Sequence, residues 1–169
     1  MIKKLLIILI YLPIIGLGQN ILLSEDFEED NMPMGWYQTT NANDGGWLLG
    51  TNLDLESEWF PIAPHGNIIA TNDDACGESP DCDKSMDYLI TPELDFTNSN
   101  NIVLQFENYF DGESLWGDTE VATLEYSLDN GANWEVLYTI IGTNDGLWDL
   151  QTFDLSSLAG NANVLIAFH

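Results

Sequence analysis

The stretch TEVATLEYSLDNGANWEVLYTI, residues 119–140, contains two strand patterns separated by a turn. In its first part, residues 121, 123 and 125 alternate with the more apolar residues 122, 124, 126 and 128, and this alternation predicts a strand with one buried face. Asp129, Asn130 and Gly131 then provide the residue types of a tight hairpin turn. A second strand is predicted over Trp134–Ile140, so the stretch predicts an antiparallel hairpin.

Short strands of this kind recur along the chain. Residues Asn101–Phe110 are apolar at Ile102, Leu104 and Phe106, and a shift near Asn108 predicts a bulge. Asn, Asp and Gly residues separate the strands, and no long run with helical periodicity occurs. The expected fold class is all-β, an antiparallel β-sandwich or jelly roll. The other predicted strands are Ile21–Phe27, Asn67–Thr71, Tyr88–Thr91, Leu150–Leu155 and Asn163–Phe168.

The charge of the chain restricts its partners. Its 169 residues include 28 Asp and Glu, three Lys and no Arg, which gives a formal net charge of −25. Without arginine the chain lacks the planar guanidinium that binds phosphate and guanine edges in a bidentate manner. Nucleic acids and anionic membrane surfaces are therefore excluded as expected partners. A hydrophobic content of 45% predicts a folded domain rather than an acidic disordered tail.

The first 18 residues have the features of a secretory signal peptide. Lys3 and Lys4 precede an apolar run from Leu5 to Ile15, and small residues at 16 and 18 predict cleavage before Gln19. A membrane anchor is the alternative, although the run is short for a bilayer span. Loss of the two lysines with the leader would change the net charge from −25 to −27. The expected organisation is a signal peptide over 1–18 and one domain over 19–169, with no membrane insertion after cleavage and a secreted or cell-surface location.

The predicted export of the chain also determines how its two cysteines are interpreted. Cys76 and Cys82 lie six positions apart in an acidic loop. In an oxidising compartment we expect them to form a disulfide, because structural zinc sites usually need four ligands. Free thiols are the alternative.

The chain ends within a strand pattern. Val164, Ile166 and Phe168 alternate up to His169, and no turn or polar tail follows. A sandwich lacking its last strand would have an open edge, so we expect the natural protein to continue beyond His169.

A shared family pattern is carried, in chain order, by the segments LLSEDFEEDNMPMGW (22–36), DGGW (44–47), ATNDDAC (70–76), CDKSMDYLITPELDF (82–96), LQFENYFDG (104–112), LEYSLDNGANWEVL (124–137) and FDLSSLAGNANVLIAFH (153–169). Taken together, they resemble secreted bacterial modules of the cleaved-adhesin, MAM-like or choice-of-anchor J type. The resemblance covers nearly all of residues 19–169 and implies a jelly-roll β-sandwich, exported by bacteria related to Bacteroidetes, that works as an adhesion or binding module. The family pattern normally continues past the last strand into a segment with an acidic pair, which this sequence lacks.

Motifs for catalysis are weak. Residues 127–134 match the S-x-D-x-G-x-x-W pattern of the Asp-box hairpins found in sialidases, but sialidases need several boxes and arginines. We interpret this match as a turn in which Asp129 binds turn amides and Trp134 packs beneath. The two histidines, His65 and His169, form no H-E-x-x-H motif, and His65 is interpreted as a loop residue.

Loop carboxylates beside Gly and Asn are typical calcium ligands in exported proteins. By resemblance to the adhesin modules, Glu28 and Asp44 are the best candidates for a structural Ca²⁺ site, with Asp26 as a neighbour and Asp111 as a further candidate. The acids between Asp73 and Asp87 form a second, weaker candidate. A solvated acidic surface is the alternative for each of them.

The chain has six tryptophans, most of which we expect to serve in packing. Trp59 and Trp116, in loops, are the candidates for ligand binding, since an exposed indole stacks on the apolar face of a sugar. The leading functional hypothesis is a non-catalytic extracellular binding or adhesion module for a glycan or protein. The alternative is the N-terminal accessory domain of a secreted hydrolase, most plausibly a peptidase, whose catalytic part lies beyond His169.

Overall fold

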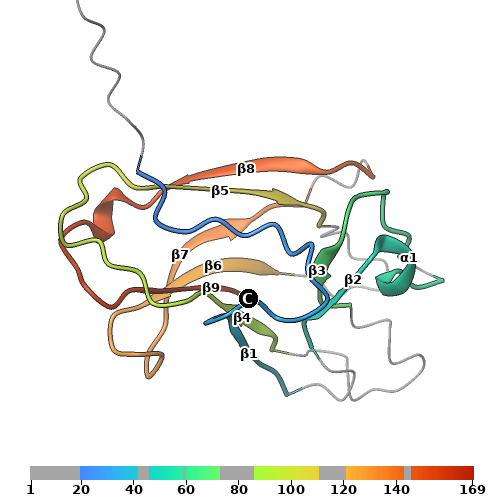
Figure 1. The fold of residues 1–169 in the computed structure, drawn as a ribbon, viewed down its shortest axis with the longest axis horizontal. Helices are drawn as coiled ribbons and strands as arrows, with labels where there is room; N and C mark the ends of the chain where they lie inside the picture. Colours follow the sequence, from blue (N-terminus) through green and yellow to red (C-terminus); the bar gives the residue numbers. More distant parts are fainter. Residues whose placement is uncertain (1–19, 42–45, 59, 73–85, 111–120, 143–145) are drawn as a thin grey trace, which may run out of the picture.

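The computed structural model describes residues 20–41, 46–58, 60–72, 86–110, 121–142 and 146–169. Within these ranges the chain forms antiparallel strands, with one short helix and one turn of 3₁₀ helix (Figure 1). The described segments contain no helix that is long and apolar enough to cross a membrane. The strands are β1 (Tyr37–Thr39), β2 (Leu48–Gly50), β3 (Ile68–Ala70), β4 (Tyr88–Ile90), β5 (Val103–Asn108), β6 (Ala122–Ser127), β7 (Glu135–Ile140), β8 (Asp149–Asp154) and β9 (Leu165–Phe168); the helices are α1 (Asn52–Leu55) and η2 (Ser156–Leu158).

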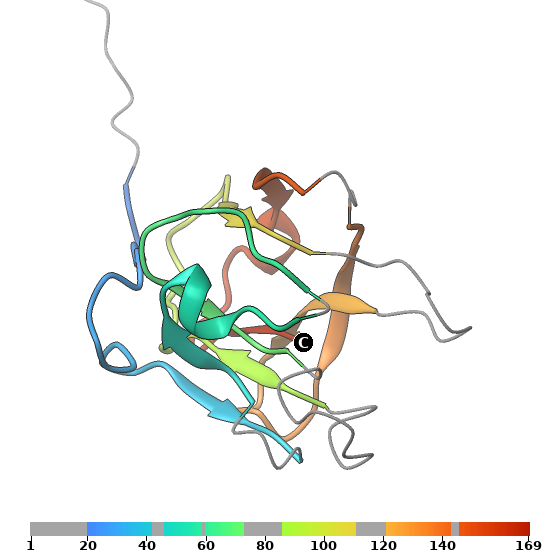
Figure 2. The same cartoon turned by 90° about the vertical axis from the view of Figure 1, so that its right-hand side faces the viewer.

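The strands form one large sheet and two strand pairs. The large sheet has the order β1-β4-β9-β6-β7, while β5 pairs with β8 and β2 pairs with β3. Every pairing is antiparallel. In Figure 1 the β5–β8 pair forms one layer and the strands β6, β9 and β4 lie in the other, and Figure 2 shows the same arrangement from the side. The predicted all-β sandwich is therefore confirmed.

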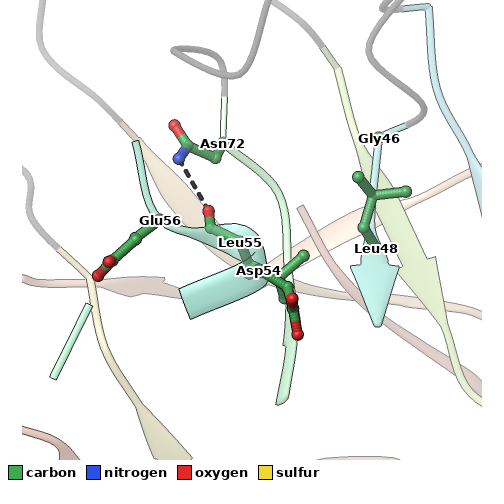
Figure 3. Close-up of a pocket in the computed structure, with 7 residues that line it drawn as sticks. Gly46, Leu48, Asp54, Leu55, Glu56 and Asn72 are labelled. Atoms are coloured by element: carbon green, nitrogen blue, oxygen red, sulfur yellow. Dashed lines mark hydrogen bonds between the residues drawn. The ribbon is translucent and has the colours of Figure 1, made fainter. Parts of the chain in front are cut away.

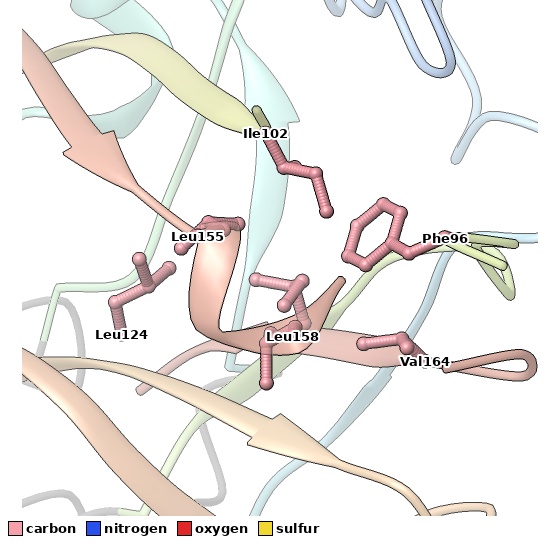
Figure 4. Packing of buried hydrophobic residues seen from close by; sticks show 7 residues of the cluster. Phe96, Ile102, Leu124, Leu155, Leu158 and Val164 are labelled. Carbon is pink, nitrogen blue, oxygen red and sulfur yellow. The ribbon is translucent and has the colours of Figure 1, made fainter. Parts of the chain in front are cut away.

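The main core lies between these two layers (Figure 4). Leu124 of β6 and Ile166 of β9 point into it from the large sheet, and both are at most 1% exposed. Ile102 and Leu155, at the ends of the β5–β8 pair, supply the opposite side, and the ring of Phe96 fills the space between. Burial of such a set removes apolar surface from water, which is the main favourable contribution to folding.

The outer face of the large sheet carries a second, smaller cluster. Ile90, Leu165 and Ala167 are buried there, with Tyr88 and Trp134 packed against them. This explains a departure from the predicted pattern of β6, whose odd-numbered face was expected to be the polar one. Glu125 on that face is only 5% exposed: its Oε1 lies 2.8 Å from both the Thr123 hydroxyl and His169 Nδ1, and its strand lies between β9 and β7.

Most predicted strands are confirmed with slightly shorter bounds, but two details are wrong. Residues Ile21–Phe27 are not a strand: none of the described strands pairs with the segment, and Phe27 has a φ of 55° where its ring packs on Trp36. The bulge expected near Asn108 is also absent, since β5 pairs in register with β8 as far as Asn108. The register shift occurs instead between Leu124 and Glu125, in the β6–β7 pair.

The final strand lies in the middle of the large sheet. β9 pairs with β4 on one side and with β6 on the other. Its pairing with β6 extends to the last residue, where Thr123 and His169 exchange main-chain hydrogen bonds of 2.6 and 3.0 Å. The sheet therefore depends on the segment that ends the sequence, whereas continuation beyond His169 stays a prediction.

Candidate functional site

Most of the predicted site residues lie outside the described residues. This applies to the metal candidates Asp44 and Asp111, to the ligand-binding candidates Trp59 and Trp116, and to the disulfide partners Cys76 and Cys82. The other four tryptophans, Trp36, Trp47, Trp134 and Trp148, are buried or half-buried, as predicted for packing residues.

The two described metal candidates lie in the extended segment before β1. The Asp26 carboxylate accepts a hydrogen bond from the Glu28 amide at 3.2 Å. Glu28 itself lies against the loop before β3, where its Oε2 accepts from the Asn67 amide at 3.3 Å and its main-chain oxygen accepts from the Asn67 side chain at 3.0 Å. The approach to Gly66 is so close that a Cβ there would lie 2.0 Å from Glu28 Oε1. Gly66 thus lets the carboxylate reach the loop.

An acidic hollow of about 370 Å³ lies beside this contact. Glu29, Asp30, Asp54 and Asn67 contribute polar groups to its wall. The Asp54 carboxylate is already engaged at the start of α1, where hydrogen bonds from the Thr51 hydroxyl and amide hold its pKa below the usual value. In the part of the chain that the structure describes, no three His, Cys, Asp or Glu side chains converge as metal ligands. The described acids alone do not complete the six to eight oxygens of a Ca²⁺ site.

A smaller cavity lies beside α1 and β2 (Figure 3). Its volume is about 60 Å³, and Leu48, Leu55 and Ala70 form its apolar wall. The side chain of Asn72 donates a hydrogen bond of 3.2 Å to the Leu55 main-chain oxygen and ties the end of β3 to the helix. Sites for drug-sized ligands measure roughly 300 Å³ or more, so this cavity is too small for one.

A polar and aromatic cluster lies where the loop 60–67 meets the end of the β5–β8 pair. His65 Nε2 lies 2.8 Å from Glu107 Oε2, and the imidazole packs against the Trp148 ring with a centroid distance of 4.6 Å. Tyr109 packs on the other aromatics, at 5.3 Å from Trp148 and 5.6 Å from Phe60. We call these five residues the His65 cluster.

Two hydrogen bonds fix the aromatic rings of the His65 cluster to the loop. The Trp148 indole donates to the Ala63 oxygen at 3.0 Å, and the Tyr109 hydroxyl donates to the Pro61 oxygen at 2.8 Å. The rings are thereby held in place while the His65 and Glu107 side chains keep 32% and 58% of their surface exposed. From the sequence, His65 is interpreted only as a loop residue, since nothing local indicates a partner 42 positions away.

The His65 cluster continues into the solvent-facing side of the β5–β8 pair. Glu107 lies opposite Leu150, and the next outward pair is Gln105 with Thr152. The Gln105 amide donates to the Thr152 hydroxyl at 3.1 Å, and Leu150 is 66% exposed. A strip of amide, hydroxyl, carboxylate and imidazole groups next to aliphatic and aromatic surface therefore runs along this face.

The second histidine belongs to a more buried group on the outer face of the large sheet. His169 Nδ1 lies 2.8 Å from Glu125 Oε1, which also accepts from the Thr123 hydroxyl at 2.8 Å. The His169 ring stacks on Tyr88 at 3.9 Å. Burial, and then the charge of Glu125, raise the pKa of Tyr88. The Glu125 side chain is only 7% exposed, so this group offers a bound molecule less contact than the His65 cluster.

The Asp-box match is a structural turn, as predicted from the sequence. Asp129 Oδ1 accepts from the Asn133 amide at 2.9 Å and from the Ser127 hydroxyl at 2.8 Å. Asn130 and Gly131 both have positive φ, at 60° and 82°, and Trp134 packs on the second apolar cluster. These residues build the β6–β7 hairpin.

Comparison with family models, with curated proteins and with solved structures finds no match for this chain.

Proposed function

We propose that this chain is a non-catalytic extracellular binding module whose ligand surface is the outward side of the β5–β8 pair together with the His65 cluster. The observation that supports this most is the pairing of an accessible carboxylate and imidazole, Glu107 and His65, beside fixed aromatic rings. Fixed rings lose little conformational freedom on binding, and a few directed polar groups set the orientation of a ligand.

A neutral glycan is the ligand class that this surface suits best. Glu107 accepts hydrogen bonds from hydroxyl groups, Gln105 and Thr152 can both donate and accept, and Leu150 offers an apolar contact. A net charge of −25 and the lack of arginine disfavour anionic ligands such as uronates or sialylated chains. A protein ligand is the alternative within the same proposal.

The test is binding of the purified chain to an array of neutral and anionic glycans, followed by calorimetry with the best neutral ligand. We expect Glu107→Gln and His65→Ala each to weaken binding at least tenfold. Glu135→Gln is the matched control, because Glu135 is also an exposed strand residue with one side-chain partner, the Tyr126 hydroxyl at 2.7 Å. Equal affinities for all four proteins would contradict the proposed surface.

We also propose that a structural Ca²⁺ ion binds near Glu28, with Asp26, Asp44 and Asp111 as further candidate ligands. The contact of Glu28 with the loop before β3 supports this, because an ion there would join the N-terminal segment to the sandwich. Binding to the folded state alone stabilises it by about 2.7 kcal/mol at a free ion concentration of a hundred times Kd.

The calcium proposal is tested by melting temperatures in Ca²⁺ and in chelator at matched ionic strength. We expect Ca²⁺ to raise the melting temperature of the unmodified chain, and Glu28→Gln and Asp44→Asn to remove most of that increase. Glu93→Gln, which removes one exposed acid elsewhere, controls for the loss of charge. Identical melting temperatures with and without Ca²⁺ would leave these acids as a solvated surface.

Secretion or display at the cell surface is part of the same proposal, as are cleavage before Gln19 and the Cys76–Cys82 disulfide. N-terminal sequencing and a non-reducing peptide map of exported material test them directly. The jelly-roll connectivity implied by the adhesin resemblance also stays a prediction. The alternative function, an accessory domain of a secreted hydrolase, requires a catalytic domain after His169, which the full reading frame would reveal.

A further inference from the structure

Strand β7 forms one edge of the large sheet. It pairs with β6 on its inner side, and no described strand pairs with its outer side. Its position is fixed from within the core, since the Tyr138 ring packs on Phe153 at 4.7 Å and its hydroxyl donates to the Asp154 oxygen at 2.7 Å. β7 is therefore a firmly packed strand whose outer edge is unpaired among the described residues.

The register shows which main-chain groups of β7 point outward. Thr123 of β6 exchanges both its main-chain hydrogen bonds with His169, on the side away from β7. Successive residues of an antiparallel strand direct their N–H and C=O groups to opposite sides. Leu124 therefore bonds towards its partner Tyr138, and Thr139, opposite Thr123, directs its N–H and C=O groups away from the sheet. An added strand would bond to Thr139 without disturbing the β6–β7 ladder.

The side chains along this edge are unusually uncharged for so acidic a chain. Residues 134–141, WEVLYTII, contain one acid, Glu135, and no lysine, proline or glycine. Val136 is 60% exposed and Ile141 is 78% exposed. Native proteins usually protect such edges with lysine or proline, and a short β-prone segment with little charge is well suited to strand addition.

We propose that β7 pairs in antiparallel fashion with β7 of a second copy of this chain, about a two-fold axis at Thr139, and so joins two large sheets into one. The charge pattern favours a second copy as the occupant. An isologous contact brings the same patch together from both copies, and residues 136–141 contain no acid. The two Glu135 residues would lie eight strand positions apart, roughly 26 Å, far beyond the screening length of about 8 Å at physiological salt.

The same charges predict how the association depends on salt. Each copy carries a net charge of −25, so long-range repulsion opposes the approach of two copies although the contact itself is apolar. Added NaCl screens this repulsion. The dimer should therefore become more populated as ionic strength rises, which is the opposite of a contact built on opposite charges.

The experiment is sedimentation velocity on the full chain over micromolar to millimolar concentrations, in low and in high NaCl. We expect a monomer–dimer equilibrium that shifts towards the dimer with concentration and with salt. Hydrogen exchange should show the Thr139 amide protected in the dimer and exchanging at least tenfold faster in the monomer.

Two variants at one position test the edge in different ways. Thr139→Pro removes the outward N–H group but no ladder bond, and Thr139→Asp places two carboxylates opposite each other across the axis. Both should be monomeric under all conditions. Thr139→Ala and Val121→Asp are the controls: the first keeps the main-chain donor, and the second adds an acid at a 64% exposed residue before β6. Both should still form dimers.

Circular dichroism and thermal melts establish whether each variant is folded. If Thr139→Pro is unfolded, Thr139→Asp still tests the edge, because it replaces only an exposed side chain. A chain that stays monomeric at millimolar concentration and high salt would overturn the proposal. This holds even if the β7 edge then binds an extended peptide of another protein, because the proposed occupant is a second copy of this chain. A dimer that persists in both Thr139→Pro and Thr139→Asp would place the contact elsewhere and overturn it equally.

Discussion

Among the described acids, Asp129 has the carboxyl pKa that its surroundings shift most. Hydrogen bonds from the Asn133 side chain, the Asn133 amide and the Ser127 hydroxyl lower its pKa from the ordinary value of an aspartate to about 2. Ser127 in turn accepts from the Gly131 amide at 2.9 Å, so one carboxylate and one hydroxyl hold the whole turn. The ionised form of Asp129 is therefore the form that the folded hairpin stabilises.

Asp129→Asn is expected to make stability less dependent on acid pH. The folded pKa lies below the unfolded value, so the contribution of Asp129 is complete above about pH 4 and is lost as pH falls through 2. The variant should melt at a lower temperature than the unmodified chain at pH 7, and the difference should shrink as pH falls through 2. Glu58→Gln, at another exposed acid, controls for charge. A difference that stays constant from pH 7 to pH 2 would contradict this account.

Leu124 has the opposite character, because its contribution is apolar and independent of pH. It is completely buried in the main core, opposite the β5–β8 layer. Leu124→Ala should lower the unfolding free energy by about 2–5 kcal/mol, through lost transfer energy and the cavity left behind. Val121→Ala, at an exposed residue three positions earlier, should change it by less than about 0.5 kcal/mol. Denaturant unfolding of both variants measures the contrast.

At the scale of the elements, β9 holds the large sheet together. It is bonded to β4 and β6, and it contributes to the core on both faces: Ile166 faces the main core, while Leu165 and Ala167 belong to the second cluster. Ala167 lies opposite Ile90 on one side and Glu125 on the other. A small side chain at this position leaves room for its larger neighbours.

Ala167→Leu should therefore destabilise the fold by overpacking. Ala167 is fully buried, and larger side chains inserted into packed cores typically cost about 1–3 kcal/mol. Ala122→Leu, at a partly exposed residue of the neighbouring strand, is the control and should cost less. Chemical denaturation with unchanged slopes would show that stability changed while the cooperative unit did not. An unaffected Ala167→Leu variant would mean that the second cluster is loosely packed.

For the whole molecule, repulsion between acids is the dominant long-range interaction. The 28 acids are offset by only three lysines, which leaves a net charge of −25. Within the described part of the chain, both ion pairs involve a histidine, His65 in one and His169 in the other. Neither pair carries an attractive charge when its histidine is neutral. Folding brings the acids closer together, so the compact state is opposed by its own field.

Stability should accordingly increase with NaCl at pH 7. Raising ionic strength from 0.01 to 0.15 M shortens the screening length from about 30 Å to about 8 Å, which weakens the repulsion between exposed acids. Thermal melts in NaCl at fixed pH measure the effect, and sodium sulfate at equal ionic strength separates screening from general salting-out. A melting temperature that falls with added NaCl would show that attractive charge pairs outweigh the repulsion.

The sequence by itself determined the all-β class, the places of seven strands and the β6–β7 turn. These features are local. Alternation of apolar and polar residues indicates a strand with one buried face. In the turn, the Asp129 carboxylate accepts a main-chain hydrogen bond, and Asn130 and Gly131 adopt the positive φ that the turn requires. β1 (YQT) and β2 (LLG) escaped prediction because neither contains the β-branched apolar residue, Ile, that marks the equally short β3 and β4. The segment Ile21–Phe27 alternates between more and less buried residues, but none of the described strands pairs with it.

Only the tertiary structure decided which strands are neighbours. A period of two cannot tell a central strand from an edge strand, so neither the burial of Glu125 nor the central place of β9 could be inferred from alternation. The His65 cluster is likewise a product of topology, since the loop before β3 meets the end of β5 only when the layers pack. Pairing between distant segments depends on how all layers bury their apolar faces together, and no single stretch of the chain determines this.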